Sequence, residues 1–127
     1  MDKPPEDKGD RYDIATEVLF PQGSHINVAG LAAGIQPWAN RTLTEVNEAV
    51  VRLGVLDGDF HWHKHDDEDE FFFVLEGRLD IELPDRMVTL DPGQGVTVPR
   101  GVMHFPHARG RTVVLMVEKS SVDARGD

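Results

Sequence analysis

The stretch HKHDDEDEFFFVLEG, residues 63–77, decides which fold this sequence predicts. Two histidines alternate with other residues, a run of acids follows, and an apolar run then ends at a glycine. Successive side chains of an extended segment point to opposite faces, so His63 and His65 share one face, together with His61 just upstream. The acids that follow are expected to form a solvated loop before the next strand.

From about Glu45 onward, apolar residues recur at every second position, which is the period of a half-buried strand. Glycine and proline signals interrupt this pattern, among them Gly54, Asp57-Gly58 and Asp91-Pro92-Gly93. Strands are therefore expected at residues 46–53, 60–65, 71–75, 79–83, 87–90, 96–98 and 112–117. Seven or eight short strands at this spacing predict an all-β sandwich or barrel.

One short helix is expected within residues 24–36. The apolar residues at helical spacing are Val28, Leu31, Ala32 and Ile35. Ser24 or Asn27 would cap the start of this helix, and Gly34 would end it. Residues 37–41 are then expected to form a connector to the first strand.

The first 25 residues differ in character from the rest of the chain. Glu17–Gly23 resemble a protease site used in expression vectors, with an inserted proline. Residues 1–25 are therefore interpreted either as a vector-derived leader or as a native arm. A native arm would let Val18–Phe20 add a strand to a sheet edge, including the edge of a partner subunit. In both cases residues 26–127 are predicted to form a single barrel domain.

The composition excludes several classes of function. The chain has 127 residues and a net charge of −10, so its surface repels phosphate backbones and nucleic-acid binding is not expected. No apolar run approaches the ~20 residues of a membrane span and no secretory pattern is present, so a cytoplasmic protein without a membrane partner is expected. The sequence has no cysteine, which excludes disulfides and thiolate metal ligands.

Further residues with metal-binding chemistry follow the alternating histidines. Glu70 begins the next expected strand, and His104 lies 34 residues beyond it, after Pro99-Arg100-Gly101. Imidazole nitrogens together with one carboxylate suit Fe, Mn, Co, Ni, Cu or Zn. These residue types are compatible with one divalent transition metal per chain as a cofactor.

The spacing of these residues resembles the two motifs of the cupin family. His63-x-His65-(x)4-Glu70-(x)6-Gly77 is similar to the first motif, and Gly93-(x)5-Pro99-x-Gly101-(x)2-His104 is similar to the second. The chain departs from the pattern twice. The glycine that opens the first motif lies one residue closer, at Gly58, and Ala108 stands where an asparagine often closes the second. That asparagine is not a metal ligand in the family, so the predicted site is unaffected.

From about Ile26 to Asp127 the chain resembles the small single-domain bacterial cupins, which are often labelled mannose-6-phosphate-isomerase-like or RmlC-like jelly rolls. The segments that carry the resemblance are Glu45-Val46-Asn47, Gly58-Asp59-Phe60, Trp62-His63-Lys64-His65, Asp69-Glu70-Phe71 and Val98-Pro99-Arg100-Gly101-Val102. The resemblance implies a double-stranded β-helix barrel and a homodimer. It also implies a metal held by His63, His65, Glu70 and His104.

Other side chains are candidates for the interior near this centre. His61 should point inward by its parity, and it is interpreted as a hydrogen-bond donor to a ligand, a proton shuttle, a substrate contact or a satisfied interior histidine. Phe72, Val74 and Met103 are the candidates for lining a substrate pocket. Arg52 is a further candidate to reach that pocket from the preceding strand.

Several aromatic residues are expected to face outward. Phe60 and Trp62 alternate with the histidines, so they should point away from the barrel interior. Phe71 and Phe73 should likewise pack against a second sheet layer or a partner. His107 is expected at the rim of the barrel.

Three functions are compatible with such a site. The first is a metalloenzyme of dioxygenase, isomerase or lyase type that acts on a small, mostly uncharged organic molecule, because no lysine or arginine shares the parity of the ligands in the first motif. The alternative is a non-catalytic, metal-dependent barrel that binds or senses a small molecule. A structural or storage barrel with a vestigial site is the third. The fold alone does not choose among them.

Overall fold

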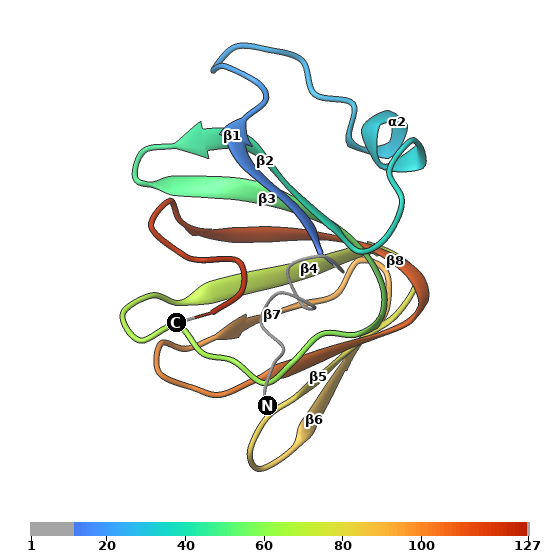
Figure 1. The fold of residues 1–127 in the computed structure, drawn as a ribbon, viewed down its shortest axis with the longest axis vertical. Coiled ribbons are helices and arrows are strands. Elements are labelled where there is room, and N and C mark those ends of the chain that lie inside the picture. Colours follow the sequence, from blue (N-terminus) through green and yellow to red (C-terminus); the bar gives the residue numbers. More distant parts are fainter. Residues whose placement is uncertain (1–11, 127) are drawn as a thin grey trace, which may run out of the picture.

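Eight strands and one short helix make up residues 12–126, the part of the chain that the structure, a computed structural model, describes (Figure 1). The elements are β1 (Asp13–Val18), α2 (Val28–Ala33), β2 (Ala39–Val46), β3 (Ala49–Asp59), β4 (Glu70–Glu76), β5 (Leu79–Glu82), β6 (Met87–Leu90), β7 (Gly95–Val98) and β8 (Phe105–Lys119). The predicted all-β fold with one short helix is therefore confirmed. Within residues 12–126, no helix has the length and apolar character that spanning a membrane demands.

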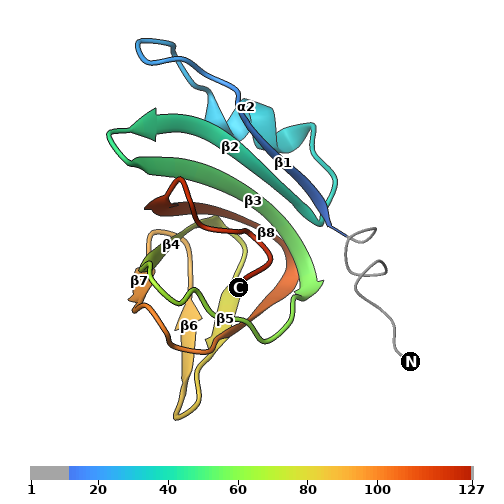
Figure 2. The ribbon, with the colours of Figure 1, turned by 60° about the vertical axis from the view of Figure 1, so that its left-hand side comes forward.

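Strand β8 organises the sheet. It has 15 residues and pairs antiparallel with β3 along most of its length. The first residues of β8 also pair with β5, and its last residues pair with β4. The strand order is β1-β2-β3-β8-β4-β7, with β6 beyond β5. Figure 2 shows β3 and β8 curving strongly, so that the sheet bends round into a barrel.

Two apolar cores lie on opposite sides of the β3–β8 pair. The barrel interior holds the larger core, in which Val74, Leu79 and Ile81 are fully buried. A second core lies between the outer face of the sheet and α2. Because side chains alternate along a strand, Val113 of β8 joins the core under α2 and Val114 joins the interior. Each fully buried aliphatic side chain contributes roughly 1.5–3 kcal/mol through burial.

The expected helix is present within its predicted boundaries. The side chain of Asn27 caps it by accepting a hydrogen bond of 3.0 Å from the backbone N–H of Gly30, and Gly34 follows its last turn. Of the two predicted caps, Asn27 is therefore the one used. Six residues are too few for a helix that is stable alone, so the packing of Ala32 on the sheet keeps it in place.

Strand boundaries before the histidines were predicted wrongly. Residues 39–41, expected as a connector, begin β2, and the expected turns at Gly54 and Asp57-Gly58 lie inside β3. A Cβ at Gly54 would lie 3.0 Å from the side chain of Val114, so this glycine permits close packing in a continuous strand. Gly58 has a φ of +85° at the point where the register with β8 shifts, which is the place of a β-bulge.

Residues 60–65 are not a regular strand, contrary to the prediction. Their only ladder contact is an isolated bridge between His63 and His104, with backbone N–H···O distances of 3.0 Å and 2.8 Å in the two directions. The predicted alternation nevertheless holds for two of the three histidines, since His63 and His65 are buried while Trp62 is 41% exposed. His61 is only partly buried. Phe60 breaks the alternation, because it is buried rather than facing outward.

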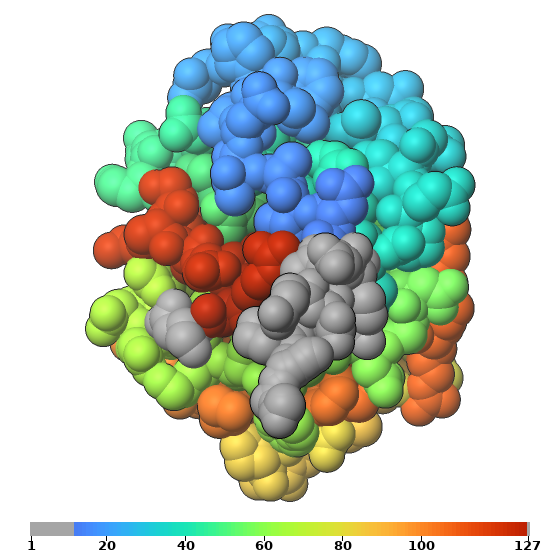
Figure 3. All heavy atoms as spheres, viewed as in Figure 1, coloured from blue at the N-terminus to red at the C-terminus, as the bar shows by residue number. Residues whose placement is uncertain are grey.

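The N-terminal strand adds to the edge of this chain's own sheet. β1 pairs in parallel with β2, and Leu19 and Phe20 continue the contact by donating backbone hydrogen bonds to Thr42 and Leu43. Figure 3 shows β1 (blue) at the surface beside the segment that follows β8 (red). Residues 1–11 of the expected arm or leader lie outside the described residues. The origin of residues 1–25, the domain boundary after residue 25 and the homodimer stay predictions.

Candidate metal centre

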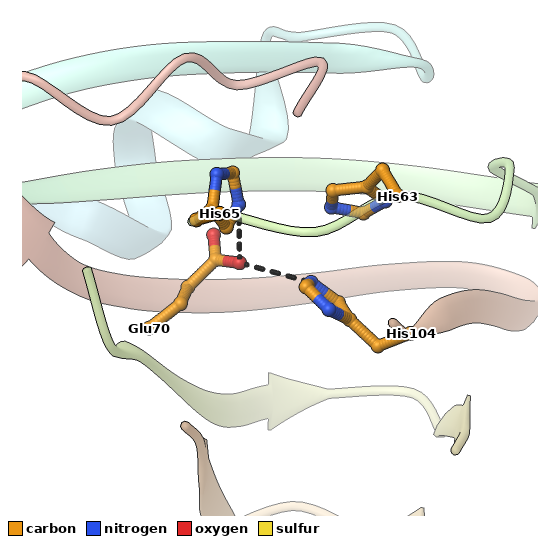
Figure 4. A group of neighbouring side chains, drawn as sticks. All are labelled: His63, His65, Glu70 and His104. Atoms are coloured by element: carbon orange, nitrogen blue, oxygen red, sulfur yellow. Dashed lines mark hydrogen bonds and ion pairs between the residues drawn. The ribbon is translucent and has the colours of Figure 1, made fainter. Parts of the chain in front are cut away.

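The structure brings together the four residues that the motifs predict as metal ligands (Figure 4). His63 and His65 lie between β3 and β4, Glu70 is the first residue of β4, and His104 directly precedes β8. One ligand atom from each lies within 4.8 Å of the others. The exposed fractions of His63, His65, Glu70 and His104 are 7%, 2%, 5% and 1%.

Backbone carbonyl groups orient two of the imidazole rings. The Nδ1 of His63 lies 3.0 Å from the carbonyl oxygen of His61, and the Nδ1 of His104 lies 2.9 Å from that of Val102. A carbonyl oxygen only accepts, so each Nδ1 carries the proton and donates it. In a neutral ring the lone pair is then on Nε2, which is the atom available to a metal ion.

The carboxylate of Glu70 faces two of these rings. Its Oε1 lies 3.1 Å from Nε2 of His65 and 3.3 Å from Nε2 of His104. With the proton of His104 on Nδ1, a lone pair of its Nε2 faces a carboxylate oxygen that also only accepts. A cation at the centre, or a second proton on the ring, resolves this contact. The donor set and its geometry therefore fit a metal ion.

The electrostatics of His63 favour its neutral form. Burial and the neighbouring His104 lower the pKa of His63 to about 3, and these effects outweigh the hydrogen bond to the backbone of His61, which raises it. At neutral pH this ring therefore carries no charge. Metal ions compete with protons for imidazole nitrogen, so a low pKa keeps the ligand atom available.

A second carboxyl group lies behind Glu70. Glu118 is its register partner on β8 and is buried. Burial raises the pKa of Glu70, but hydrogen bonds with Glu118, His104 and His65 outweigh burial and hold that pKa well below its usual range. Burial and the charge of Glu70 raise the pKa of Glu118 to about 10. Glu118 therefore keeps its proton, and Glu70 keeps its negative charge.

Arg52 anchors Glu118 from the neighbouring strand. Its guanidinium donates to the carboxyl group of Glu118, to the backbone oxygen of Val122 at 2.8 Å and to Oγ1 of Thr42 at 3.2 Å. The sequence suggested Arg52 for the pocket, whereas the structure places it behind Glu118. The sequence analysis missed Glu118, although a charged residue directly after the apolar run Val113–Val117 is a signal that could have identified it.

A cavity of about 40 Å³ adjoins the cluster, with His63 and Glu70 in its wall. The remaining wall is mostly apolar and comprises Tyr12, Ile14, Trp38, Ala39, Asn40, Leu56, Phe60, Phe72, Pro106, Met116 and Ala124. The predicted Phe72 borders this cavity. Val74 lies within the apolar core instead, and Met103 is 37% exposed, so neither of these two predicted residues is part of the wall.

The sequence analysis missed the aromatic side of this cavity. Trp38 and Phe60 stack with ring centroids 4.9 Å apart, and Tyr12 lies 4.7 Å from Phe60. Tyr12 and Trp38 come from the N-terminal part of the chain, which no local pattern connects to the motifs. The parallel pairing of β1 with β2 brings Tyr12 to the centre, whereas Trp38 directly precedes β2 and is placed by the pairing of β2 with β3.

His61 lies beside the cluster. Its ring centroid is 5.2 Å from that of His63 and 3.8 Å from that of Phe60. Its Nε2 donates to the backbone oxygen of Arg125 at 2.7 Å, and its Nδ1 lies 3.4 Å from the hydroxyl of Tyr12. His61 therefore joins the segment that follows β8 to the N-terminal end of β1.

The sheet of this chain curls around three histidines and one glutamate. The protein is therefore a small β-barrel with a candidate metal centre. The chain belongs to the cupin domain family, whose family model matches residues 49–118. The curated protein YdbB of Bacillus subtilis (strain 168), which is uncharacterized, is 40% identical over 86 residues, covering 67% of this chain and 76% of YdbB.

Solved structures agree with this family. A cupin-2 domain containing protein from Shewanella frigidimarina NCIMB 400 is 35% identical, with a TM-score of 0.70, and the match covers 74% of this chain and 93% of that one. Protein NMB1881 from Neisseria meningitidis is 26% identical, with a TM-score of 0.68, and the match covers 76% and 99% of the two chains. The chain is therefore a small bacterial cupin, as its motifs predicted.

Proposed function

We propose that this cupin binds one divalent transition metal per chain through His63, His65, Glu70 and His104 and acts as a metalloenzyme on a small organic molecule. The observation that carries the proposal is the convergence of three imidazoles and one carboxylate within 4.8 Å in a buried position. Four ligands leave one or two positions open on a five- or six-coordinate ion. Dioxygenase, isomerase and lyase chemistry are the candidate reaction types.

Residues around the centre orient the ligands and keep a negative charge there, which favours a cation. The carbonyl groups of His61 and Val102 orient two imidazoles, and the proton on Glu118 leaves the negative charge on Glu70. A bound ion of this class supplies Lewis-acid polarisation of a substrate oxygen or, when it is iron, activation of O2. The apolar wall excludes water from the face where a substrate would lie.

The cavity wall supports an uncharged, flat ligand. Tyr12, Trp38 and Phe60 offer aromatic faces, and Asn40 is a neutral polar group among them. No lysine or arginine is among the described residues that line this cavity, so an anionic ligand would find no counter-charge apart from the metal. A neutral carbonyl compound or a phenol fits this wall better than a phosphate or a carboxylate does.

A non-catalytic, metal-dependent barrel that binds or senses a small molecule is the second candidate. It is favoured by the scarcity of groups for proton transfer in the cavity wall. His63 and Glu70 are assigned to the metal, which leaves the hydroxyl of Tyr12 as the further ionisable group among the described lining residues.

Protein loaded separately with Fe, Mn, Co, Ni, Cu or Zn distinguishes the two functions. Oxygen uptake and product formation are measured with neutral ketones, diketones and catechols, and with benzoate as the anionic control. Turnover of a neutral compound that disappears in His104→Ala supports the enzyme. Binding without turnover, detected by a change in tryptophan fluorescence, supports the second candidate, and the absence of both contradicts the proposed ligand class.

We further propose a cytoplasmic homodimer without a nucleic-acid partner, from the composition, the net charge and the family. Light scattering of the purified chain tests the dimer. Cell fractionation tests the location, and a salt-dependent DNA-binding assay tests the excluded partner.

A further inference from the structure

The segment that follows β8, residues 120–126, lies directly against the candidate metal centre, and we call it the closing segment. Figure 3 shows it in red at the surface, next to β1. At its start, Arg52 donates to the backbone oxygen of Val122 at 2.8 Å, and Val122 is buried. The hydroxyl of Ser121 donates to Glu68 at 2.9 Å, so the segment is also joined to the acidic loop between His65 and Glu70.

The far end of the closing segment rests on a predicted metal ligand. A Cβ added to Gly126 would lie 2.5 Å from Cβ of His63 and 3.0 Å from two atoms of its ring. Gly126 also has a φ of +94°, a region that favours glycine. No larger residue fits here unless the segment moves away from His63.

A hydrogen bond from His61 holds this end of the closing segment in place. The carbonyl of Arg125 only accepts, so His61 donates from Nε2 over 2.7 Å. The other nitrogen, Nδ1, then accepts from the hydroxyl of Tyr12, 3.4 Å away. The ring is fixed by its contact with Phe60, whose centroid lies 3.8 Å away. His61 thus joins the closing segment to the aromatic wall of the cavity.

The cavity is smaller than the ligands that its wall suits. Its volume of about 40 Å³ is well below the roughly 150 Å³ of a cavity that holds benzene. A ring-sized molecule therefore reaches the centre only if part of the wall moves. The closing segment contributes Ala124 to that wall, whereas Tyr12 and Ile14 belong to the region that strand pairing with β2 holds.

Of the parts of the cavity wall, the closing segment needs the least free energy to move. Ser121, Asp123 and Arg125 are exposed, and within this segment only Val122 is fully buried. No strand pairing holds it, since β8 ends at Lys119. Its release exchanges a few hydrogen bonds for bonds to water, while displacement of β1 or β3 would break the sheet.

We propose that the closing segment is a gate over the metal centre and that His61 is the residue that holds it shut. The gate rests on the proposed metal site and adds to it a control of access: it governs how fast an ion or a ring-sized ligand reaches the centre. This gives His61 a positioning role that acts through Arg125.

The test uses Co²⁺ itself as the probe, with uptake followed by its visible absorption and loss followed by transfer to a chelator in excess. His61→Phe keeps an aromatic ring beside Phe60 but removes the hydrogen bond to Arg125. Gly126→Ala introduces the clash with His63. Gly23→Ala is the matched control, because Gly23 has a φ of +90° and a Cβ there meets nothing within 4 Å.

Both gate variants should accelerate uptake and loss alike, by roughly 5- to 10-fold, the equivalent of one lost hydrogen bond, with a Kd that stays within about twofold. The Gly23→Ala variant should match the unaltered chain. Unchanged rates in both gate variants, or a faster loss with no faster uptake, overturn the gate. If the unaltered chain takes up no Co²⁺, the proposed metal centre itself is wrong and the gate falls with it.

Discussion

Two groups of histidine and carboxylate lie in this barrel, and their difference shows what makes a metal centre. The inner group is the buried cluster around Glu70, in which one carboxylate oxygen faces Nε2 of two different histidines. The outer group surrounds His107 of β8, whose Nδ1 lies 2.8 Å from Asp59 and whose Nε2 lies 3.2 Å from Glu82. Both groups contain the same chemical types, but only the inner one converges on a point.

Burial and hydrogen bonding shift the pKa values of the histidines in the two groups in opposite directions. In the inner group, burial and a neighbouring imidazole lower the pKa of His63 to about 3. In the outer group, burial lowers the pKa of His107, but its hydrogen bonds with Asp59 and Glu82 outweigh that effect and raise it. Both nitrogens of His107 face carboxylate oxygens, which only accept hydrogen bonds, so neither nitrogen presents a lone pair to a metal there. Convergence, rather than composition, therefore marks the site.

The largest expected difference between the two groups is in metal affinity. His104→Ala should weaken metal binding roughly 1000-fold or more, since even the loss of an outer partner of a ligand costs 10- to 100-fold. His107→Ala should leave affinity within about twofold, because no ligand is lost. Calorimetric titration with Zn²⁺ or Co²⁺ measures both, and an equal loss in the two variants would contradict the distinction.

The next largest effect concerns a buried and an exposed arginine. Arg52→Met removes the buried donor to the carboxyl group of Glu118 and to the backbone oxygen of Val122, so buried acceptors lose their partner and the free energy of unfolding should fall by about 3 kcal/mol or more. Arg78→Met removes an ion pair with Asp91 in which both side chains are about half exposed, and it should have no measurable effect. Urea unfolding of the metal-free variants gives both values. Equal effects would show that burial does not govern the inner group.

A smaller effect, counted per pH unit, is expected in the pH dependence of stability. The pKa of Glu118 is about 10 in the folded chain, above its ordinary value of 4.5, so its contribution is full below 4.5 and is lost as the pH rises towards 10. In that window the unfolded chain has released a proton that the folded chain still holds. The free energy of unfolding of the metal-free protein should therefore fall by up to about 1.4 kcal/mol per pH unit.

The Glu118→Gln variant isolates this contribution, because glutamine keeps a donor towards Glu70 but has no proton to release. Its free energy of unfolding should vary less with pH than that of the unaltered chain. Urea unfolding at several values between about pH 6 and pH 9 compares the two slopes. Identical slopes would mean that Glu118 is ionised in the folded chain.

The smallest effect is expected at the outer group. The raised pKa of His107 means that its contribution is full below the ordinary value of 6.5 and is lost as the pH rises through the folded value. His107→Gln should therefore lower the Tm slightly at about pH 5.5 and leave it unchanged at about pH 9. A loss that is larger at the higher pH would contradict the ion pair.

The sequence predicted the inner group well because three of its four ligands lie close together in the chain. His63, His65 and Glu70 lie within eight residues, and their motif resembles that of a family with a known barrel. The helix was predicted because Val28, Leu31, Ala32 and Ile35 recur at helical spacing and Gly34 follows them. These features depend on neighbours in the chain, which a single sequence contains.

What the sequence could not predict depends on contacts between distant segments. Gly54 was interpreted as a turn residue. In the structure it is a glycine because the side chain of Val114 packs against it, and Val114 belongs to β8, which is distant in the sequence. β2 was missed since its residues ANRTLTEV lack a clear alternation of apolar and polar side chains. Glu118 and the closing segment reach the centre only through the pairing of β8 with β3 and β4.

The most direct test of the central claim is the metal content of protein purified without a histidine tag and without chelators. Mass spectrometric metal analysis should find about one transition metal per chain, directly or after addition of Fe, Mn, Ni or Zn, and this metal should be absent from Glu70→Gln and retained by His107→Ala. Less than roughly 0.1 metal per chain, with no uptake of the added ions, would contradict a metal centre in this cupin.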